Sequence, residues 1–205
     1  MTIELLNIDC MEYMATQPDN AFDLAIVDPP YGINVKTNMG RRAGVKNDNP
    51  AAKWDAEPPA GEYFSELFRV SKDQVVWGAN HFISRMPIDS KCWLLWDKMF
   101  SEDVSFAQYE MAWTSFNSVA KKFEKAPNEK GRIHPTQKPT DLYSWIMNKY
   151  AEKDMRILDT HLGSGSSAIA AHYFGCDFVG CEIDADYYKA ASERFDKETR
   201  QCAMF

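Results

Sequence analysis

The chain has 205 residues, of which 45% are hydrophobic and 26% are charged, and its formal net charge is -7. This apolar content is enough to form a buried core, so it excludes a mainly disordered chain, and the length fits one large domain. The negative net charge excludes a protein that coats nucleic acid through bulk positive charge, so any contact with nucleic acid must be local.

The cysteines and the start of the chain indicate the compartment. The five cysteines form no Cys-x-x-Cys pair, so we expect free thiols and no metal site built on them. The first residues lack the basic and apolar pattern of a signal peptide, and no apolar run reaches the roughly 20 residues that cross a bilayer. The sequence therefore predicts a cytoplasmic protein without a membrane partner.

Short apolar runs alternate with amphipathic segments along the chain. The runs are nearly continuous, which is typical of strands covered on both faces, and they lie at residues 23–27, 74–77, 92–96, 156–159 and 178–183. Apolar residues at helical spacing predict helices at residues 141–150, 166–174 and 184–197. The alternation predicts a three-layer α/β domain around a mostly parallel sheet.

Two polar segments interrupt this alternation. Residues 32–61 are rich in Gly, Pro and Asn, and residues 118–132 are rich in Lys. Neither has the sustained periodicity of a helix or a strand. We therefore expect both to be mobile loops inserted in a single domain of residues 1–205.

The clearest chemical feature is the tetrapeptide Asp28-Pro29-Pro30-Tyr31, which directly follows the expected strand at 23–27. Ligands of open α/β sheets bind beyond the carboxyl ends of strands. The two prolines stiffen the turn, and a carboxylate beside a free carbonyl accepts both hydrogens of an exocyclic amine. A neighbouring tyrosine stacks on a planar heterocycle. The tetrapeptide predicts a pocket for an amino group on a flat base; the alternative is a strand-ending turn with a core tyrosine.

A second candidate site is the run LDTHLGSGSS at residues 158–167, which follows a strand and opens a helix. Such a turn brings backbone amides close to a ligand, and Glu182, about twenty residues downstream, is placed to bind the two hydroxyls of a ribose. The run lacks the third glycine of a dinucleotide fingerprint and the lysine of a P-loop. It therefore favours a nucleoside without a pyrophosphate; the alternative is a tight turn without a ligand.

Together these motifs resemble the S-adenosylmethionine-dependent DNA amino-methyltransferases of the N6-adenine or N4-cytosine type. The matching segments are residues 7–10, 28–31, 77–82, 134–139 and 158–167, with Glu182. They follow the permuted, beta-class order, in which the catalytic motif precedes the cofactor motif, and HPTQKP at 134–139 is the most discriminating. The resemblance covers most of the chain. It implies the class I methyltransferase fold, a Rossmann-like α/β/α sandwich with a mostly parallel seven-stranded sheet, one strand of it antiparallel.

The resemblance also implies a catalytic role for Asp28, Pro29, Pro30 and Tyr31. Asp28 and the Pro29 carbonyl would accept hydrogen bonds from the target amine. Tyr31 would stack on a base that has been flipped out of the duplex. Catalysis would then come chiefly from positioning and preorganised electrostatics, without a covalent enzyme intermediate.

The implied cofactor is S-adenosyl-L-methionine. The residues expected to bind it are Asp9, Asp28, Thr136, Lys138, Asp159, His161, Gly163, Ser164, Gly165, Ser166 and Glu182. Among these, Glu182 would hold the ribose, and Lys138 would pair with the methionine carboxylate. His161 departs from the family, which usually has Phe at this position, so a polar side chain replaces an apolar contact.

DNA is the implied partner. Its expected contacts are Lys36, Arg41, Arg42 and Lys46, with residues 118–132 as a second candidate; the alternative for such a charge cluster is a solvated surface. The resemblance further implies a homodimer, no metal, and a bacterial or bacteriophage-infected cell as the setting.

The sequence thus predicts methyl transfer to N6 of adenine in DNA, because the catalytic motif begins with Asp, whereas N4-cytosine members more often begin with Ser. N4-cytosine methylation and a catalytically decayed DNA-binding homologue are the alternatives. An RNA or protein-glutamine methyltransferase is disfavoured, because those enzymes usually begin the tetrapeptide with Asn and place it after the glycine loop.

Overall fold

The structure is a computed structural model that describes residues 1–34, 55–86, 89–103, 107–127 and 132–200. These residues form one eight-stranded sheet in the order β1-β8-β7-β2-β3-β5-β4-β6. The strands are β1 (Ile3–Asn7), β2 (Phe22–Val27), β3 (Ser71–Trp77), β4 (Trp93–Asp97), β5 (Tyr109–Thr114), β6 (Lys121–Glu124), β7 (Arg156–Asp159) and β8 (Asp177–Glu182). The helices are α1 (Cys10–Ala15), α2 (Gly61–Val70), α3 (Thr140–Tyr150), α4 (Ser166–Phe174) and α5 (Ala185–Arg200), with short 3-10 turns η2 (Ala79–His81) and η3 (Ile83–Arg85).

The sheet is mostly parallel, as the sequence predicts. Strand β5 pairs antiparallel with both of its neighbours, β3 and β4, and every other pairing among the described strands is parallel. The strand number differs from the expectation, because the described residues form eight strands rather than seven.

One of these strands, β6, lies within residues 118–132, which the sequence analysis assigns to a loop. It pairs in parallel with β4 at the edge of the sheet, and three of its four residues are exposed. Its one half-buried residue, Phe123, packs on Trp145 of α3 with ring centroids 5.5 Å apart. Exposed lysines are common on edge strands, where they discourage pairing with other chains. Because β6 is mostly polar, no apolar run in the sequence marks it as a strand.

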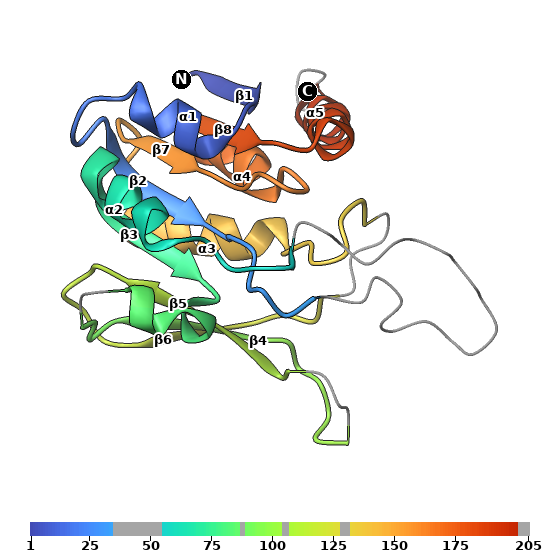
Figure 1. The fold of residues 1–205 in the computed structure, drawn as a ribbon. Coiled ribbons are helices and arrows are strands. Elements are labelled where there is room, and N and C mark those ends of the chain that lie inside the picture. Colours follow the sequence, from blue (N-terminus) through green and yellow to red (C-terminus); the bar gives the residue numbers. More distant parts are fainter. Residues whose placement is uncertain (35–54, 87–88, 104–106, 128–131, 201–205) are drawn as a thin grey trace.

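The helices cover both faces of the sheet and so make a three-layer sandwich (Figure 1). Successive side chains of a strand point to opposite faces, and β2 follows this rule. Leu24 and Ile26 belong to the core beneath α3, α4 and α5, whereas Ala25 and Val27 belong to the core beneath α1 and α2. The predicted α/β/α sandwich is therefore confirmed.

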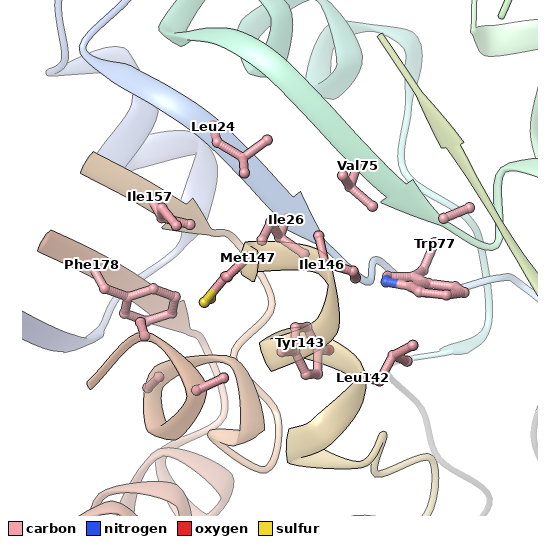
Figure 2. Packing of buried hydrophobic residues seen from close by; sticks show 14 of the residues in the cluster. Leu24, Ile26, Val75, Trp77, Leu142, Tyr143, Ile146, Met147, Ile157 and Phe178 are labelled. Atoms are coloured by element: carbon pink, nitrogen blue, oxygen red, sulfur yellow. The ribbon is translucent and has the colours of Figure 1, made fainter. Parts of the chain in front are cut away.

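Helix α3 illustrates how the larger core is built. Its buried residues Leu142, Ile146 and Met147 recur at helical spacing and so form one face. Figure 2 shows Ile146 and Met147 next to Ile26 of β2, and Leu142 near Trp77 of β3.

Five neighbouring strands determine where a ligand can bind. Strands β1, β8, β7, β2 and β3 lie side by side and run in parallel, so their carboxyl ends meet at one edge of the sheet (Figure 1). The loops after these strands come from both halves of the chain. This edge is where open α/β sheets bind ligands.

We predict that Leu142→Ala destabilises the fold by about 2–5 kcal/mol, because it removes a fully buried side chain and leaves a cavity. Val119→Ala is the control, since Val119 is 64% exposed and its truncation should change stability by less than about 0.5 kcal/mol. Denaturant titration of both variants measures the difference. Equal midpoints would contradict the packing described for α3.

Candidate active site

Four adjacent parallel strands each end in an acidic residue. Asp9 follows β1, Glu182 ends β8, Asp159 ends β7 and Asp28 follows β2. The order of these strands in the sheet is β1-β8-β7-β2, so residues far apart in the sequence line one edge. The two motifs singled out in the sequence therefore emerge beside each other.

The catalytic turn is held by hydrogen bonds at both of its ends. Tyr31 donates its hydroxyl to Asp28 Oδ1 at 2.7 Å. The backbone N–H groups of Tyr31 and Gly32 donate to Asp55 Oδ1 at 2.8 and 3.0 Å. Asp55 is itself buried, so the carboxylate fixes the turn from inside the protein. Burial raises the pKa of Asp28 against the lowering influence of Lys138.

The Tyr31 ring lies in a slot that only glycine permits. Gly78 has φ +70°, and a Cβ on it would lie 2.0 Å from Tyr31 Cε1. On another side, Tyr31 stacks on the His81 ring with centroids 5.0 Å apart and planes 15° apart. The base stacking expected of Tyr31 stays a prediction, because in this structure the ring stacks on a protein side chain.

The glycine loop is cross-linked to the neighbouring strand end. Gly163 donates its N–H to Glu182 Oε2 at 2.9 Å, so the loop and the expected ribose ligand form one unit. Asp159 accepts hydrogen bonds from the His161 N–H at 3.0 Å and from Ser167 Oγ at 2.6 Å. Burial nevertheless raises the pKa of Asp159 to about 7.

His161 joins a short chain of hydrogen bonds. Its Nδ1 lies 2.9 Å from Thr160 Oγ1, which lies 2.7 Å from the Tyr63 hydroxyl. Burial lowers the pKa of His161 to about 4, so the ring is neutral at physiological pH. Sequence reasoning did not connect this histidine with Tyr63, which lies 98 positions earlier in the sequence.

A cavity of about 250 Å³ lies between the catalytic turn and the glycine loop. Its wall includes eight residues that the sequence analysis names: Asp28, Pro30, Thr136, Lys138, His161, Gly163, Ser164 and Glu182. A second cavity, of about 270 Å³, contains Asp9 and shares Pro30 and His161 with the first. The two motifs therefore border a common space.

Other expected site residues do not line these two cavities. They are Pro29, Tyr31, Asp159, Gly165 and Ser166. Ser166 is buried, and its Oγ accepts a hydrogen bond from Arg194 Nη1 at 2.9 Å. Asp159 and Ser166 thus support the walls of the site from inside the protein, whereas Pro29 and Tyr31 belong to the catalytic turn.

Two functional candidates were missed by sequence reasoning. Glu110 of β5 and Lys98, which follows β4, lie beside the catalytic turn, and their side chains pair at 2.5 Å. The one available signal is an acidic residue in the otherwise apolar run YEMAW. Charged residues are rarely buried unless they are paired, so a Glu in an apolar run is a signal that could have pointed to a site.

The residues expected to contact DNA, Lys36, Arg41, Arg42 and Lys46, lie outside the described part of the chain. Within the described part, no cluster of His, Cys, Asp or Glu is suited to a metal ion. In the same part, no helix is long and apolar enough to cross a membrane.

Comparison with known proteins identifies the class and then the family. The fold is the class I methyltransferase fold. Residues 76–193, more than half of the chain, match the family model described as DNA methylase, of the N6 and N4 type. The chain therefore belongs to this DNA methylase family, as its motifs predict.

Curated relatives agree with this family. YubD of Escherichia coli (strain K12), which its name describes as a methylase, is 27% identical over 206 residues, covering 91% of this chain and 87% of the relative. The type II methyltransferase M2.MboI of Moraxella bovis is 23% identical over 240 residues, covering 93% of this chain and 86% of the relative.

Solved structures share the fold. The M1.HpyAVI–SAM complex aligns with a TM-score of 0.66 at 18% identity, covering 95% of this chain and all of that one. The cytosine-N4-specific PvuII DNA methyltransferase aligns with a TM-score of 0.65 at 11% identity, covering 98% of this chain and 91% of that one.

We predict that Gly78→Ala destabilises the protein by at least about 1–2 kcal/mol, because alanine is strained at positive φ and its Cβ would collide with Tyr31. Gly61→Ala is the matched control, since a Cβ there meets nothing within 4 Å. Thermal unfolding of the two variants measures the effect. If both variants unfold at the wild-type temperature, the slot described for Tyr31 is wrong.

Proposed function

We propose that this DNA methylase transfers a methyl group from S-adenosyl-L-methionine to the exocyclic N6 of adenine in DNA. The observation that carries the proposal is the shared cavity: Asp28 of the catalytic turn and Gly163 and Glu182 of the nucleoside side lie in one wall. An amine held at Asp28 and a nucleoside held at Glu182 would therefore occupy the same cavity.

The residues around the two cavities fit the cofactor. Glu182 is a carboxylate next to a glycine loop, the pairing that binds ribose hydroxyls in nucleotide-binding α/β folds. Asp9 in the second cavity is an acceptor for an amino group of the nucleobase. Thr136 and Ser164 supply hydroxyl groups to the first cavity. S-adenosyl-L-methionine, when bound, supplies an electrophilic methyl group.

The protein's part in the chemistry is to orient the amine. The lone pair of an exocyclic nitrogen is delocalised into the ring, so the nitrogen is a weak nucleophile. Hydrogen bonds from the amine to Asp28 and to the Pro29 carbonyl would localise that lone pair and aim it. Asp28 is placed to take the proton that the nitrogen loses after transfer. Fixed donors and acceptors of this kind act by positioning and preorganised electrostatics.

The target base must leave the duplex to reach this turn. Tyr31 is the proposed stacking partner, and it would have to exchange its contact with His81 for one with the base. A homodimer would help an acidic chain to surround the duplex.

Methylation of cytosine N4 is the second candidate. Adenine and cytosine both present an amino group beside a ring nitrogen acceptor, so the catalytic turn is suited to either. PvuII, a structural relative, is named as cytosine-N4-specific. Adenine is preferred here because the motif begins with Asp28.

The base is identified by incubating the protein with mixed-sequence DNA and methyl-labelled S-adenosyl-L-methionine, followed by digestion to nucleosides. We expect label in N6-methyl-2′-deoxyadenosine; label in N4-methyl-2′-deoxycytidine would establish the second candidate. Cofactor binding by calorimetry without any label in DNA would indicate a catalytically decayed homologue.

We predict that Asp28→Ala abolishes this labelling while cofactor affinity falls only moderately, because the variant loses an acceptor for the amine and keeps Glu182 and the glycine loop. Asp19→Asn is the control, since the Asp19 side chain is 74% exposed and remote from the cavity. Labelled-methyl transfer and calorimetry are measured on both. Undiminished turnover of the Asp28 variant would refute the role given to the turn.

We further propose that Lys36, Arg41, Arg42 and Lys46 contact DNA phosphates. Replacing Arg41 and Arg42 by Ala should weaken DNA binding and flatten its dependence on salt. With fewer phosphates neutralised, the variant releases fewer counterions from the DNA when it binds. Fluorescence anisotropy at several salt concentrations measures both effects. An unchanged affinity and slope would remove these arginines from the interface.

A further inference from the structure

A row of alternating charges, with Lys138 buried and the other three side chains largely buried, lies beside the catalytic turn. Lys98 Nζ contacts Glu110 Oε1 at 2.5 Å, and Lys138 Nζ contacts Glu110 Oε2 at 2.8 Å. Lys138 Nζ also contacts Asp28 Oδ2 at 2.6 Å. The four side chains come from the end of β4, from β5, from the loop before α3 and from the turn after β2. The row ends on the carboxylate that the proposed function needs.

The donors of Lys138 are fully used in this arrangement. An ammonium group has three N–H donors, and those of Lys138 point to Asp28 Oδ2, to Glu110 Oε2 and, at 3.1 Å, to the Tyr31 hydroxyl. The pairing of Lys138 with a cofactor carboxylate, which the sequence analysis expects, would require one of these contacts to break. The contacts thus favour a role on the amine side of the cavity.

The acceptors of Asp28 are only partly used. A carboxylate has roughly four lone-pair sites. Oδ1 accepts from Tyr31 at 2.7 Å and Oδ2 accepts from Lys138 at 2.6 Å. One lone pair on each oxygen is therefore left for an amine, while the two bonds hold the plane of the carboxylate.

The environment makes the ion row rigid. The Lys138 side chain is only 2% exposed, and its Nζ lies 5.4 Å from the centroid of Trp77 and 5.5 Å from that of Tyr31. Removing one partner of a buried ion pair leaves an uncompensated charge, so the remaining groups must rearrange or change protonation. Glu110 is the second carboxylate, besides Asp28, that neutralises Lys138.

We propose that Glu110 is a positioning residue for methyl transfer: by holding Lys138 in place, it fixes the Asp28 carboxylate in the orientation that receives the amine. This inference rests on the proposed function. Glu110 does not line the cavity, so it acts through Lys138 and not by touching the substrate. Misplacing a reacting group by about 1 Å costs a rate factor of about 100, so a second partner for Lys138 has a large effect.

The charge of Glu110 also reaches Asp28. Burial raises the pKa of Asp28, Lys138 lowers it and Glu110 raises it. Burial raises the pKa of Glu110 as well, but Lys138 and Lys98 outweigh it and bring that pKa to about 2. The other titratable groups that sense the charge of Asp28 are Tyr31, Tyr63 of α2, Tyr143 of α3 and Asp159 of β7.

The sign of the expected pH effect follows from these influences. The active form carries Asp28 as a carboxylate, so activity is lost as the pH falls through the pKa of Asp28. Glu110→Gln removes a negative charge that raises this pKa. The acid limb of the pH–kcat profile should therefore move to lower pH, whereas a loss of packing alone would not move it.

The test compares Glu110→Gln with Asp196→Asn, an exposed ion-pair variant on α5. We expect Glu110→Gln to lower kcat by about tenfold to hundredfold, with KM for DNA and S-adenosylhomocysteine affinity by calorimetry within about threefold of wild type. The control should match wild type throughout. A folded Glu110→Gln protein with kcat within twofold of wild type and an unmoved acid limb would overturn the proposal.

Glu110→Asp tests the proposal if the Glu110→Gln variant does not fold. It retains the charge and shortens the side chain by one methylene, so kcat should fall while the acid limb stays in place. Wild-type kcat in this variant would overturn the proposal. Wild-type protein is measured in the same assay to distinguish failure of the proposed function from failure of the role given to Glu110. Absence of any methyl transfer by wild type contradicts the proposed function rather than the role of Glu110.

Discussion

The parallel pairing of β2 with β7 is the constraint on which the site depends. Leu24 pairs with Ile157 and Ala25 with Leu158, so the two strands end in register although they are more than a hundred residues apart. Register in a sheet with two buried faces is strongly specified, since a slip of one residue would exchange the faces of every side chain. The apolar residues of the core therefore determine where the catalytic turn and the glycine loop meet.

The electrostatics of the site follow from a competition between burial and partners. Burial raises the pKa of Asp28, Glu110 and Asp159, and the outcome for each depends on which charges lie nearby. Two lysines bring Glu110 to a pKa of about 2, whereas Asp159, held by an N–H and a hydroxyl without a cation, rises to about 7. Asp28 has one lysine and one acidic neighbour, and its pKa is raised. The pKa of Asp28 therefore depends on both Lys138 and Glu110.

Much of the fold was predictable because its signals are local. The central strands are continuous apolar runs, and α3 and α4 were placed within a residue of their observed bounds. The missed elements include β1, β5, β6 and α1, which are short or polar, and α2, whose buried residues do recur at helical spacing. Strand β6, for example, is polar and is held by its pairing with β4 and by the packing of Phe123 on Trp145.

The candidate site was predictable to the extent that its motifs are contiguous. Asp28 and Glu182 were found from their places after strands, and both line the cavity. The partners of Lys138 could not be found in this way, because Glu110 joins it only through the three-dimensional arrangement of β5 and the loop before α3. The orientation of Tyr31 depends likewise on Gly78 and His81.

A crystal structure of the protein with S-adenosylhomocysteine tests the central claim most directly. We expect the ribose hydroxyls to donate hydrogen bonds to Glu182. We also expect the thioether sulfur to face the Asp28 carboxylate, with no protein atoms between them and with room for an amine. A nucleoside bound elsewhere, or a sulfur screened from Asp28 by protein atoms, would contradict it.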